Sequence, residues 1–388
     1  MLKRYPIILM CILLIISTLT GCIQAPAQGD PGGDAQAVLS VWYSLNGKEE
    51  KELLSQLERI SQENNEFEVR GERIPETDFV DYIWKIQAGG QGPDILISTR
   101  PILSALYEKG AVSPVLAERD KAFSSAEELF TFNHELYAAP WLTDVPLLFY
   151  RKDQVKTPPY DINEIWIKKA SIAVPAPSTV FLSPWWKAEG GNLSMAGIPQ
   201  LNSPANLAFL NRLIYLRDEG LLIFDNQAMT RLVKGEVNYA ISWASQSHVL
   251  ENSQIEWDCV SLETVFGNNG KALLDKTIGI ANSSLKTTPA RESAILIILE
   301  ELLKTDTQIA MSQAGNRIPV SKEYFEGSPI TIKTKIAKTI SNSWVPSTNL
   351  LEWQFMNIQD SSWLNILAGS DTEIELEKAQ QSALELLE

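Results

Sequence analysis

The chain has 388 residues, a formal net charge of −15 at pH 7 and 45% hydrophobic residues. This acidity argues against nucleic acid as a partner, because a nucleic-acid-binding surface needs basic side chains against the phosphates. With only two histidines in the chain we expect no metal site, and we expect no cofactor. The length exceeds what one ordinary hydrophobic core organises, which predicts two lobes.

The N-terminus has the pattern of a secretory signal peptide, which we assign to residues 1–21. A short positive head precedes the apolar run IILMCILLII, which is too short to span a membrane comfortably. The run is followed by LTGC, which resembles the bacterial lipoprotein signal. That resemblance implies a lipid on Cys22, which would begin the mature chain and anchor it to the cell membrane. An ordinary secretory signal with an incidental cysteine is the alternative.

Residues 22–37 predict a flexible tether, because they are rich in Gly, Pro, Ala and Gln and cannot build a core. Cys11 leaves with the signal peptide, and Cys22 carries the lipid. Cys259 is then the remaining cysteine, so no disulfide within the chain is expected.

The first half of the mature chain alternates between strand and helix patterns. We expect strands over 38–44, 66–74 and 92–98, and helices over 47–65, 77–90 and 101–110. The first helix places Leu53, Leu54, Leu57 and Ile60 on one face. Thr77 is the expected N-cap of the second helix. This alternation is typical of a parallel α/β sheet.

The second half is less regular. Helices are expected over 161–170, 203–220, 226–235, 289–304 and 307–314, and strands over 171–175, 238–244 and 277–283. Ser203 and Gly220 have the positions of a helix cap and a helix stop. From about residue 331 the pattern is mostly helical.

Five stretches occur in the same order as in a known family. They are VWYSLNGKEEKELLSQLERI, GPDILISTRPILSALYEKGAVSPVL, HELYAAPWLTDVPLLFYRKDQV, LVKGEVNYAISWASQSHVL and GNRIPVSKEYF. Together they resemble the extracellular solute-binding proteins of ABC importers, family 1, which are of the maltose-binding type.

The resemblance implies an α/β fold of the periplasmic-binding-protein type II class. Each lobe would be a mostly parallel sheet flanked by helices, with a ligand cleft between the lobes. Lobe 1 would comprise residues 38–143 and 276–327, and lobe 2 residues 144–275 and 328–388. The chain would cross between lobes at Thr143–Asp144, near Lys276 and near Gly327. Such lobes close over a solute by a hinge motion.

The implied function is solute capture, without catalysis, and delivery to the permease subunits of an ABC transporter. The protein would be a monomer outside the cytoplasm, held at the membrane by Cys22. Two alternatives stay open. One is a secreted carbohydrate-active enzyme that uses a carboxylate pair, for which Asp144 and Glu189 can be imagined. The other is a receptor or scaffold that no longer serves transport.

The candidate ligand residues follow strands or lie at the first crossing. Aromatic rings cover the C–H faces of a sugar, and polar side chains bond its hydroxyls. The site is expected to use Trp243, Trp141, Asp144, Trp353, Asn46, Trp42, Trp185, Trp186, Arg100 and Gln246. We place Trp243 first, and we expect one member of the Trp185–Trp186 pair to reach the solute.

A mono- or oligosaccharide suits the 11 tryptophans of the chain. A polyamine or another cation would suit its acidity, but it would need several carboxylates at the strand exits. There the sequence offers mainly Asp144. A ferric-ion site would need a cluster of tyrosines, and the sequence does not display one.

Overall fold

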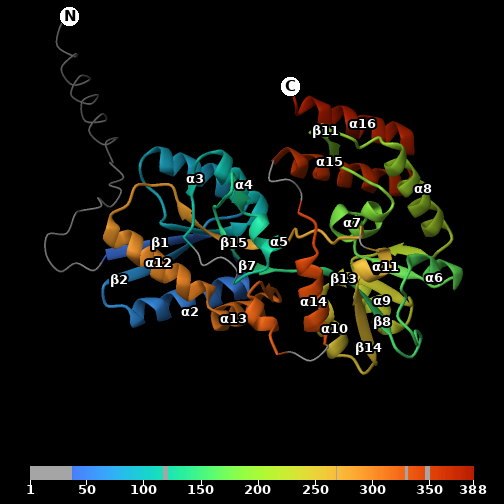
Figure 1. The fold of residues 1–388 in the computed structure, drawn as a ribbon, viewed down its shortest axis with the longest axis horizontal. Helices are drawn as coiled ribbons and strands as arrows, with labels where there is room; N and C mark the ends of the chain where they lie inside the picture. Colours follow the sequence, from blue (N-terminus) through green and yellow to red (C-terminus); the bar gives the residue numbers. More distant parts are fainter. Residues whose placement is uncertain (1–36, 117–120, 268, 328–330, 346–349) are drawn as a thin grey trace, which may run out of the picture. The chain divides into compact units, whose positions relative to one another are not determined.

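Two β-sheets, each flanked by helices, organise the protein (Figure 1). The computed structural model describes residues 37–116, 121–267, 269–327, 331–345 and 350–388. The predicted signal peptide and tether, Cys22 included, therefore lie outside the described residues, apart from Ala37. None of the helices within the described ranges is both long and apolar enough to span a membrane.

The larger sheet has seven strands in the order β16-β7-β15-β3-β1-β2, with β4 also paired to β15. These strands are β1 (Ala37–Tyr43), β2 (Phe67–Arg73), β3 (Ile95–Thr99), β4 (Val112–Ser113), β7 (Ala139–Thr143), β15 (Ile278–Ser283) and β16 (Ile318–Pro319). Strands β1 and β3 are parallel. Strand β15 runs antiparallel to β3, β4 and β7. We call the part of the protein built on this sheet lobe 1.

The smaller sheet has five strands in the order β12-β9-β13-β8-β14. These are β8 (Pro146–Arg151), β9 (Ile172–Val174), β12 (Leu222–Phe224), β13 (Tyr239–Trp243) and β14 (Trp257–Ser261). Strands β12, β9 and β13 are parallel, whereas β8 runs antiparallel to β13 and β14. We call the part built on this sheet lobe 2.

The α/β class is confirmed, but the expectation that each sheet is mostly parallel is wrong. Parallel neighbours arise where the chain returns through a helix, as between β1 and β3. Strands β8 and β15 instead enter their sheets directly from the strands and loops of the other lobe. They run against their neighbours, which makes both sheets mixed.

Helices cover both faces of the seven-stranded sheet (Figure 1). Helices α2 (Gly47–Glu63), α12 (Pro289–Leu303) and α13 (Thr305–Gly315) pack on one face, and α3 (Phe79–Ala88), α4 (Arg100–Glu108) and α5 (Ser124–Glu128) on the other. Alternate residues of β1 explain this arrangement. Leu39, Val41 and Tyr43 are buried towards α2, while Trp42 packs towards α3.

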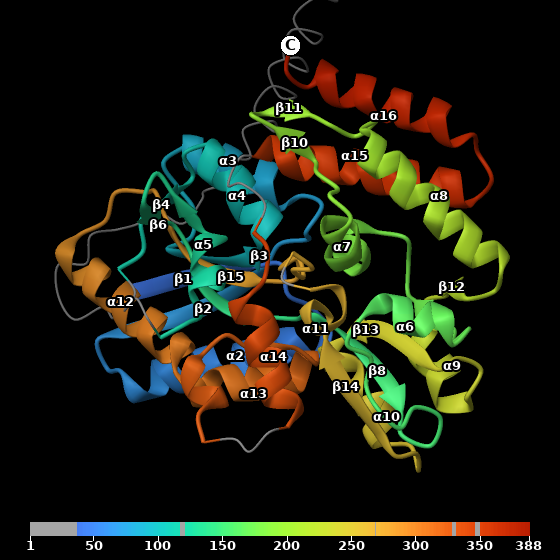
Figure 2. The same ribbon diagram turned by 45° about the vertical axis from the view of Figure 1, so that its right-hand side comes forward.

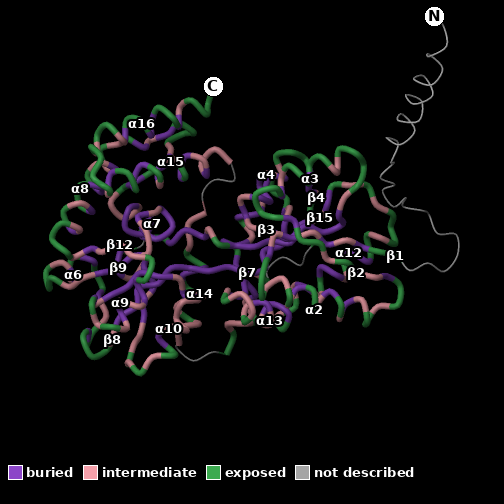
Figure 3. The backbone as a smooth tube through the Cα atoms, turned by 180° about the vertical axis from the view of Figure 1, so that it is seen from behind, coloured by how far each residue is buried: buried purple, intermediate pink, exposed green. Residues whose placement is uncertain are grey.

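The five-stranded sheet is also covered on both faces, and its strands are largely buried (Figures 2 and 3). One face holds α6 (Ile162–Ile167), α7 (Thr179–Ala188), α8 (Pro204–Asp218), α11 (Leu262–Phe266), α15 (Leu350–Leu367) and α16 (Thr372–Glu385). The other holds α9 (Ala228–Lys234), α10 (Ser247–Glu251) and α14 (Ile332–Ser341).

Short elements complete the described chain. They are the hairpins β5 (Thr131–Phe132) with β6 (Glu135–Leu136) and β10 (Ser194–Met195) with β11 (Ile198–Pro199), and the 3-10 helices η1 (Ala244–Gln246) and η2 (Lys322–Phe325). One hydrophobic cluster contains residues of both lobes, such as Phe130 and Phe149. The described residues from Val38 to Glu388 accordingly form one unit.

Most expected elements are present within a few residues of their predicted bounds, but some details differ, and the short elements β12, β14, α5, α10 and α11 were not expected. Helix α3 begins after Asp78, so Thr77 is not its N-cap. Leu54 is 40% exposed although it was expected on the buried face of α2. Helix α7 was missed altogether, because it contains Pro184, which normally disfavours a helix interior. By contrast, the Ser203 side chain accepts from the Asn206 N–H, as expected of a cap.

We expect Gly191→Ala to destabilise lobe 2. The Trp186 side chain is fully buried, and its Nε1 donates to Asn206 Oδ1 at 2.6 Å. A Cβ at residue 191 would lie 2.0 Å from that Nε1, so the indole must move out of a packed core. The expected loss is about 1–3 kcal/mol of the free energy of unfolding. Urea unfolding measures it, with Gly89→Ala as the control; equal stability of the two variants would contradict the packing of Trp186.

Candidate functional site

The chain passes from lobe 1 to lobe 2 through two residues, Asp144 and Val145, which join β7 to β8. The Asp144 carboxylate accepts hydrogen bonds from the Val145 N–H at 2.9 Å, the Ser245 N–H at 3.2 Å and the Ser245 hydroxyl. The Ala244 N–H also donates to the Val145 carbonyl at 2.8 Å. These bonds fix the start of β8 against the end of β13.

The returning chain lies directly beside this first passage. The Thr277 hydroxyl, which precedes β15, bonds the Thr143 hydroxyl at 2.8 Å. The Thr277 carbonyl accepts the Arg100 N–H at 3.0 Å. The two passages and the first residue of α4 are thereby tied together by short-range hydrogen bonds.

Asp144 is 6% exposed, and its burial raises the pKa of its carboxyl to about 6. Burial raises a carboxyl pKa because the charged form loses hydration. The hydrogen bonds from Ser245 and Val145, and the more distant charge of Arg317, act in the opposite direction without cancelling the effect. Asp144 is therefore a buried positioning residue, with both carboxylate oxygens engaged.

Arg100 and Trp353, both predicted site residues, lie together. The Arg100 guanidinium carbon is 4.0 Å from the centre of the Trp353 ring, which is a close cation–π contact. Arg100 is fully buried, and this desolvation lowers its pKa to about 9, while Asp275, Glu352 and Glu108 counteract the shift. Because α4 belongs to lobe 1 and α15 to lobe 2, this contact joins the lobes.

Trp243, at the end of β13, is half-buried. Its ring centre lies 4.9 Å from that of Phe181 on α7 and 5.8 Å from the Lys276 Nζ at the second passage. Gln246, three residues later in η1, is half-buried as well. Trp243 thus stands where β13, α7 and the returning chain meet.

Residues that the sequence reasoning missed also lie in this region. Asp360 on α15 accepts the Thr179 N–H at 2.7 Å and the Thr179 hydroxyl at 2.5 Å. Gln359 Nε2 donates to the same Thr179 hydroxyl at 2.9 Å. Burial raises the pKa of Asp360 to about 6, and nearby Asp275 adds to the effect. Two sequence features could have identified these carboxylates as candidate site residues. Asp275 directly precedes the predicted second crossing, and Asp360 lies two helical turns after the predicted site residue Trp353.

The other predicted residues lie in cores or away from these contacts. The Trp141 indole is fully buried in lobe 1, and its N–H donates to the Leu302 carbonyl at 2.7 Å. Trp185 and Trp186 are buried in lobe 2, and the Trp185 N–H donates to Glu189 at 2.6 Å. These three indoles therefore serve as core residues in this structure, which corrects the expectations that Trp141 faces the cleft and that one member of the Trp185–Trp186 pair reaches the solute.

Two further predicted residues lie on β1 and at the start of α2. Trp42 is half-buried, with its ring 5.6 Å from that of Tyr82. Asn46 is exposed at the N-terminus of α2 and makes no side-chain capping bond. Neither residue contacts the Arg100–Trp353 pair through any described interaction.

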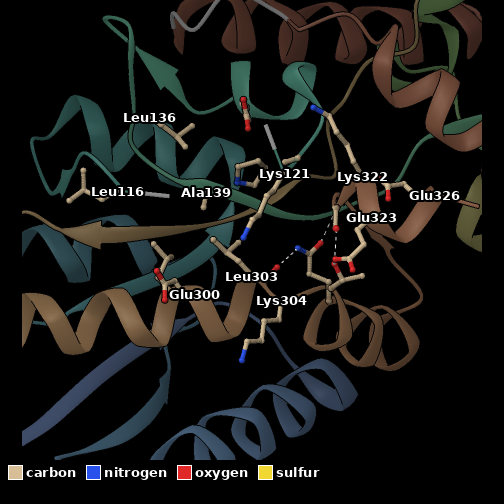
Figure 4. Close-up of a pocket in the computed structure, with 17 residues that line it drawn as sticks. Leu116, Lys121, Leu136, Ala139, Glu300, Leu303, Lys304, Lys322, Glu323 and Glu326 are labelled. Carbon is tan, nitrogen blue, oxygen red and sulfur yellow. Dashed lines mark hydrogen bonds between the residues drawn. The ribbon is translucent and has the colours of Figure 1, made fainter. Parts of the chain in front are cut away.

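A cavity of about 570 Å³ lies elsewhere, in lobe 1 (Figure 4). Figure 4 shows residues of both charges around it, including Lys304, Lys322, Glu300 and Glu323. It contains none of the predicted ligand residues. Among the described residues, no group of three or more His, Cys, Asp and Glu side chains is placed to hold a metal ion.

Asp144 predicts a specific pH dependence of stability. Its pKa is raised on folding, so the folded state binds the proton more tightly than the unfolded state, whose pKa is about 4. The associated stability is present below about pH 4 and is lost as pH rises to about 6, by up to about 3 kcal/mol. Asp144→Asn should lack this loss when urea unfolding is measured from about pH 4 to pH 7. A variant curve parallel to that of the unaltered protein would refute the assignment; Asp81→Asn, at an exposed position, is the control.

Comparison with known proteins identifies the family of this chain. A family model described as "bacterial extracellular solute-binding protein" matches residues 57–339, which is more than half of the chain. A comparison with curated proteins finds no match. The matched range contains the five-stranded sheet, every strand of the seven-stranded sheet except β1, and the passages at Asp144–Val145 and before β15. The chain belongs to the bacterial extracellular solute-binding proteins, the extracytoplasmic binding components of ABC importers.

Proposed function

We propose that this protein captures a mono- or oligosaccharide between its two lobes and presents it to the permease subunits of an ABC transporter. The observation that carries the proposal is the meeting of Arg100 and Trp353, which bring one helix of each lobe into contact beside both passages of the chain. The proposed rigid bodies are two. One comprises residues 38–143 and 276–327, and the other comprises residues 144–275 and 328–388. They move about Thr143–Asp144 and the Lys276 region.

The proposed solute site uses the side chains around these passages. Trp243 offers a half-buried ring for the C–H face of a sugar, and Arg100 and Gln246 offer donors for its hydroxyls. Asp144 holds the hinge in place through Ser245. Because the bound solute would contact both lobes, it would stabilise the closed form over the open form.

Two observations favour binding over hydrolysis, which agrees with a family that is generally non-enzymatic. The Asp144 carboxylate is fully used by Val145 and Ser245. Glu189 Oε1 accepts the Trp185 indole N–H at 2.6 Å and pairs with Arg212 at 3.0 Å. A glycosidase needs one carboxyl free to protonate a leaving group and another free to attack or activate water.

Thermal unfolding of the mature protein with a panel of sugars, amines and peptides tests this function. A bound solute raises the unfolding temperature by mass action, and the solute should be recovered unchanged. Trp243→Ala should then weaken the affinity for that solute by about 1–3 kcal/mol in titration calorimetry. Trp84→Ala, which alters an exposed tryptophan of α3, is the matched control. Turnover of a glycoside would favour a carbohydrate-active enzyme. An unfolding temperature that no compound changes would favour a receptor or scaffold that no longer serves transport.

We further propose that the protein is a monomeric lipoprotein held at the cell membrane through a lipid on Cys22. The LTGC sequence after the apolar run supports this anchor. In cells that express Cys22→Ala, the protein should leave the membrane fraction for the soluble fraction, because one signal peptide without lipidation supplies no stable anchor. Cys259→Ala, at a buried free cysteine, is the control and should stay with the membrane. Membrane retention of Cys22→Ala would disprove lipid anchoring at this residue.

A further inference from the structure

Unused hydrogen-bond acceptors gather between α7, α15 and the second passage. Asp275 is half-buried, yet its carboxylate makes no hydrogen bond or ion pair with any described residue. Asp360 uses only Oδ1 towards Thr179, and its Oδ2 has no partner among the described residues. Carboxylates withdrawn from water are costly unless donors or cations compensate them.

A buried amide adds a third unused acceptor. Gln359 is 1% exposed, and its Nε2 donates to the Thr179 hydroxyl. The hydrogen of that hydroxyl already goes to Asp360, so Thr179 can only accept from Gln359 and the orientation of the amide is fixed. Gln359 Oε1 is then left buried without a partner. A buried acceptor of this kind normally has a hydrogen-bond donor, and the described residues do not provide one.

These groups share one neighbourhood. The charge of Asp275 raises the pKa of Asp360, and Arg100 and Lys276 lower that of Asp275 without pairing with it. Trp353 is 4% exposed, and its indole N–H also lacks a partner within the described part of the chain. Trp353 and Asp360 are two turns apart on α15, so they bound a region about 10 Å long.

We propose that Asp275, Asp360 and Gln359 bind the ammonium group of an amino sugar, with Trp353 at the other end of the site. This inference rests on the proposed function and names its substrate class. An ammonium group has three N–H donors and no acceptor, which complements carboxylate and amide oxygens. The Trp353 N–H donates to a sugar hydroxyl oxygen. The span from Trp353 to Asp360 along α15, about 10 Å from the rise of about 1.5 Å per helical residue, is comparable to the length of one or two sugar rings.

The cationic side chains of the protein do not form ion pairs with Asp275 or Asp360 among the described residues. The Arg100 guanidinium lies on Trp353, and Lys276 is exposed beside Trp243. Glu352 and Lys187, the other charged groups nearby, are engaged with Ser194 and with Asn192. The net charge of −15 also favours the approach of a cationic solute.

The unaltered full-length mature protein is titrated with glucosamine, N-acetylglucosamine and glucose, and with chitobiose and its fully deacetylated form. At about pH 6.5 the sugar amines are charged, and the N-acetyl compounds are neutral controls of similar shape. We expect each amine to bind about tenfold to a hundredfold more tightly than its neutral counterpart. Asp275→Asn and Asp360→Asn should abolish this preference, whereas Asp81→Asn should retain it.

The unfolding temperatures of the variants separate recognition from folding. Both asparagine variants should be at least as stable as the unaltered protein without ligand, because each removes a desolvated charge. Equal affinity for amines and neutral sugars, or a preference that survives in both variants, would overturn the amino-sugar inference and leave the proposed function standing. No binding of any sugar here or in the wider panel would overturn both.

Discussion

The first two passages of the chain between its lobes, at Asp144–Val145 and before β15, are the constraint on which the rest depends. Only Asp144 and Val145 separate β7 from β8. The hydrogen bond between the Thr143 and Thr277 hydroxyls connects this segment to the segment that precedes β15. Because these short segments belong to both lobes, any relative motion of the lobes must be absorbed there. The same passages set Arg100, Asp275, Lys276 and Trp243 beside one another.

Burial of ionisable groups at this junction has a physical cost. Desolvation raises the pKa of Asp144 and Asp360 to about 6 and lowers that of Arg100 to about 9. Asp144 is compensated by Ser245, and Arg100 by its contact with Trp353. Neither the Asp275 carboxylate nor Gln359 Oε1 has a hydrogen-bond partner among the described residues, although Lys276 and Arg100 lower the pKa of Asp275. Polar groups left unsatisfied inside a protein are typical of sites where a ligand completes the bonding.

Much of the architecture could be predicted from local patterns. The alternation of Leu39, Val41 and Tyr43 in β1, the face of α2 and the Ser203 cap each follow from short-range rules. Helix α7 could not, because Pro184 opposes a helix locally while the core of lobe 2 stabilises it by burying Trp185 and Trp186. The mixed direction of the sheets could not be foreseen either, since it depends on where β8 and β15 enter from the other lobe.

The sequence by itself determined the α/β class and the family, because hydrophobic periodicity, turn residues and the order of the motifs are local properties of the chain. Tertiary structure alone decided which tryptophans face solvent-accessible space and which fill a core. Trp141 lies in the middle of β7 and is enclosed, with its N–H donated to the Leu302 carbonyl, whereas Trp243 ends β13 and is half-buried. The carboxylates show the same dependence: Asp275 and Asp360 are 85 positions apart in the printed sequence, yet the charge of Asp275 raises the pKa of Asp360 in the folded protein.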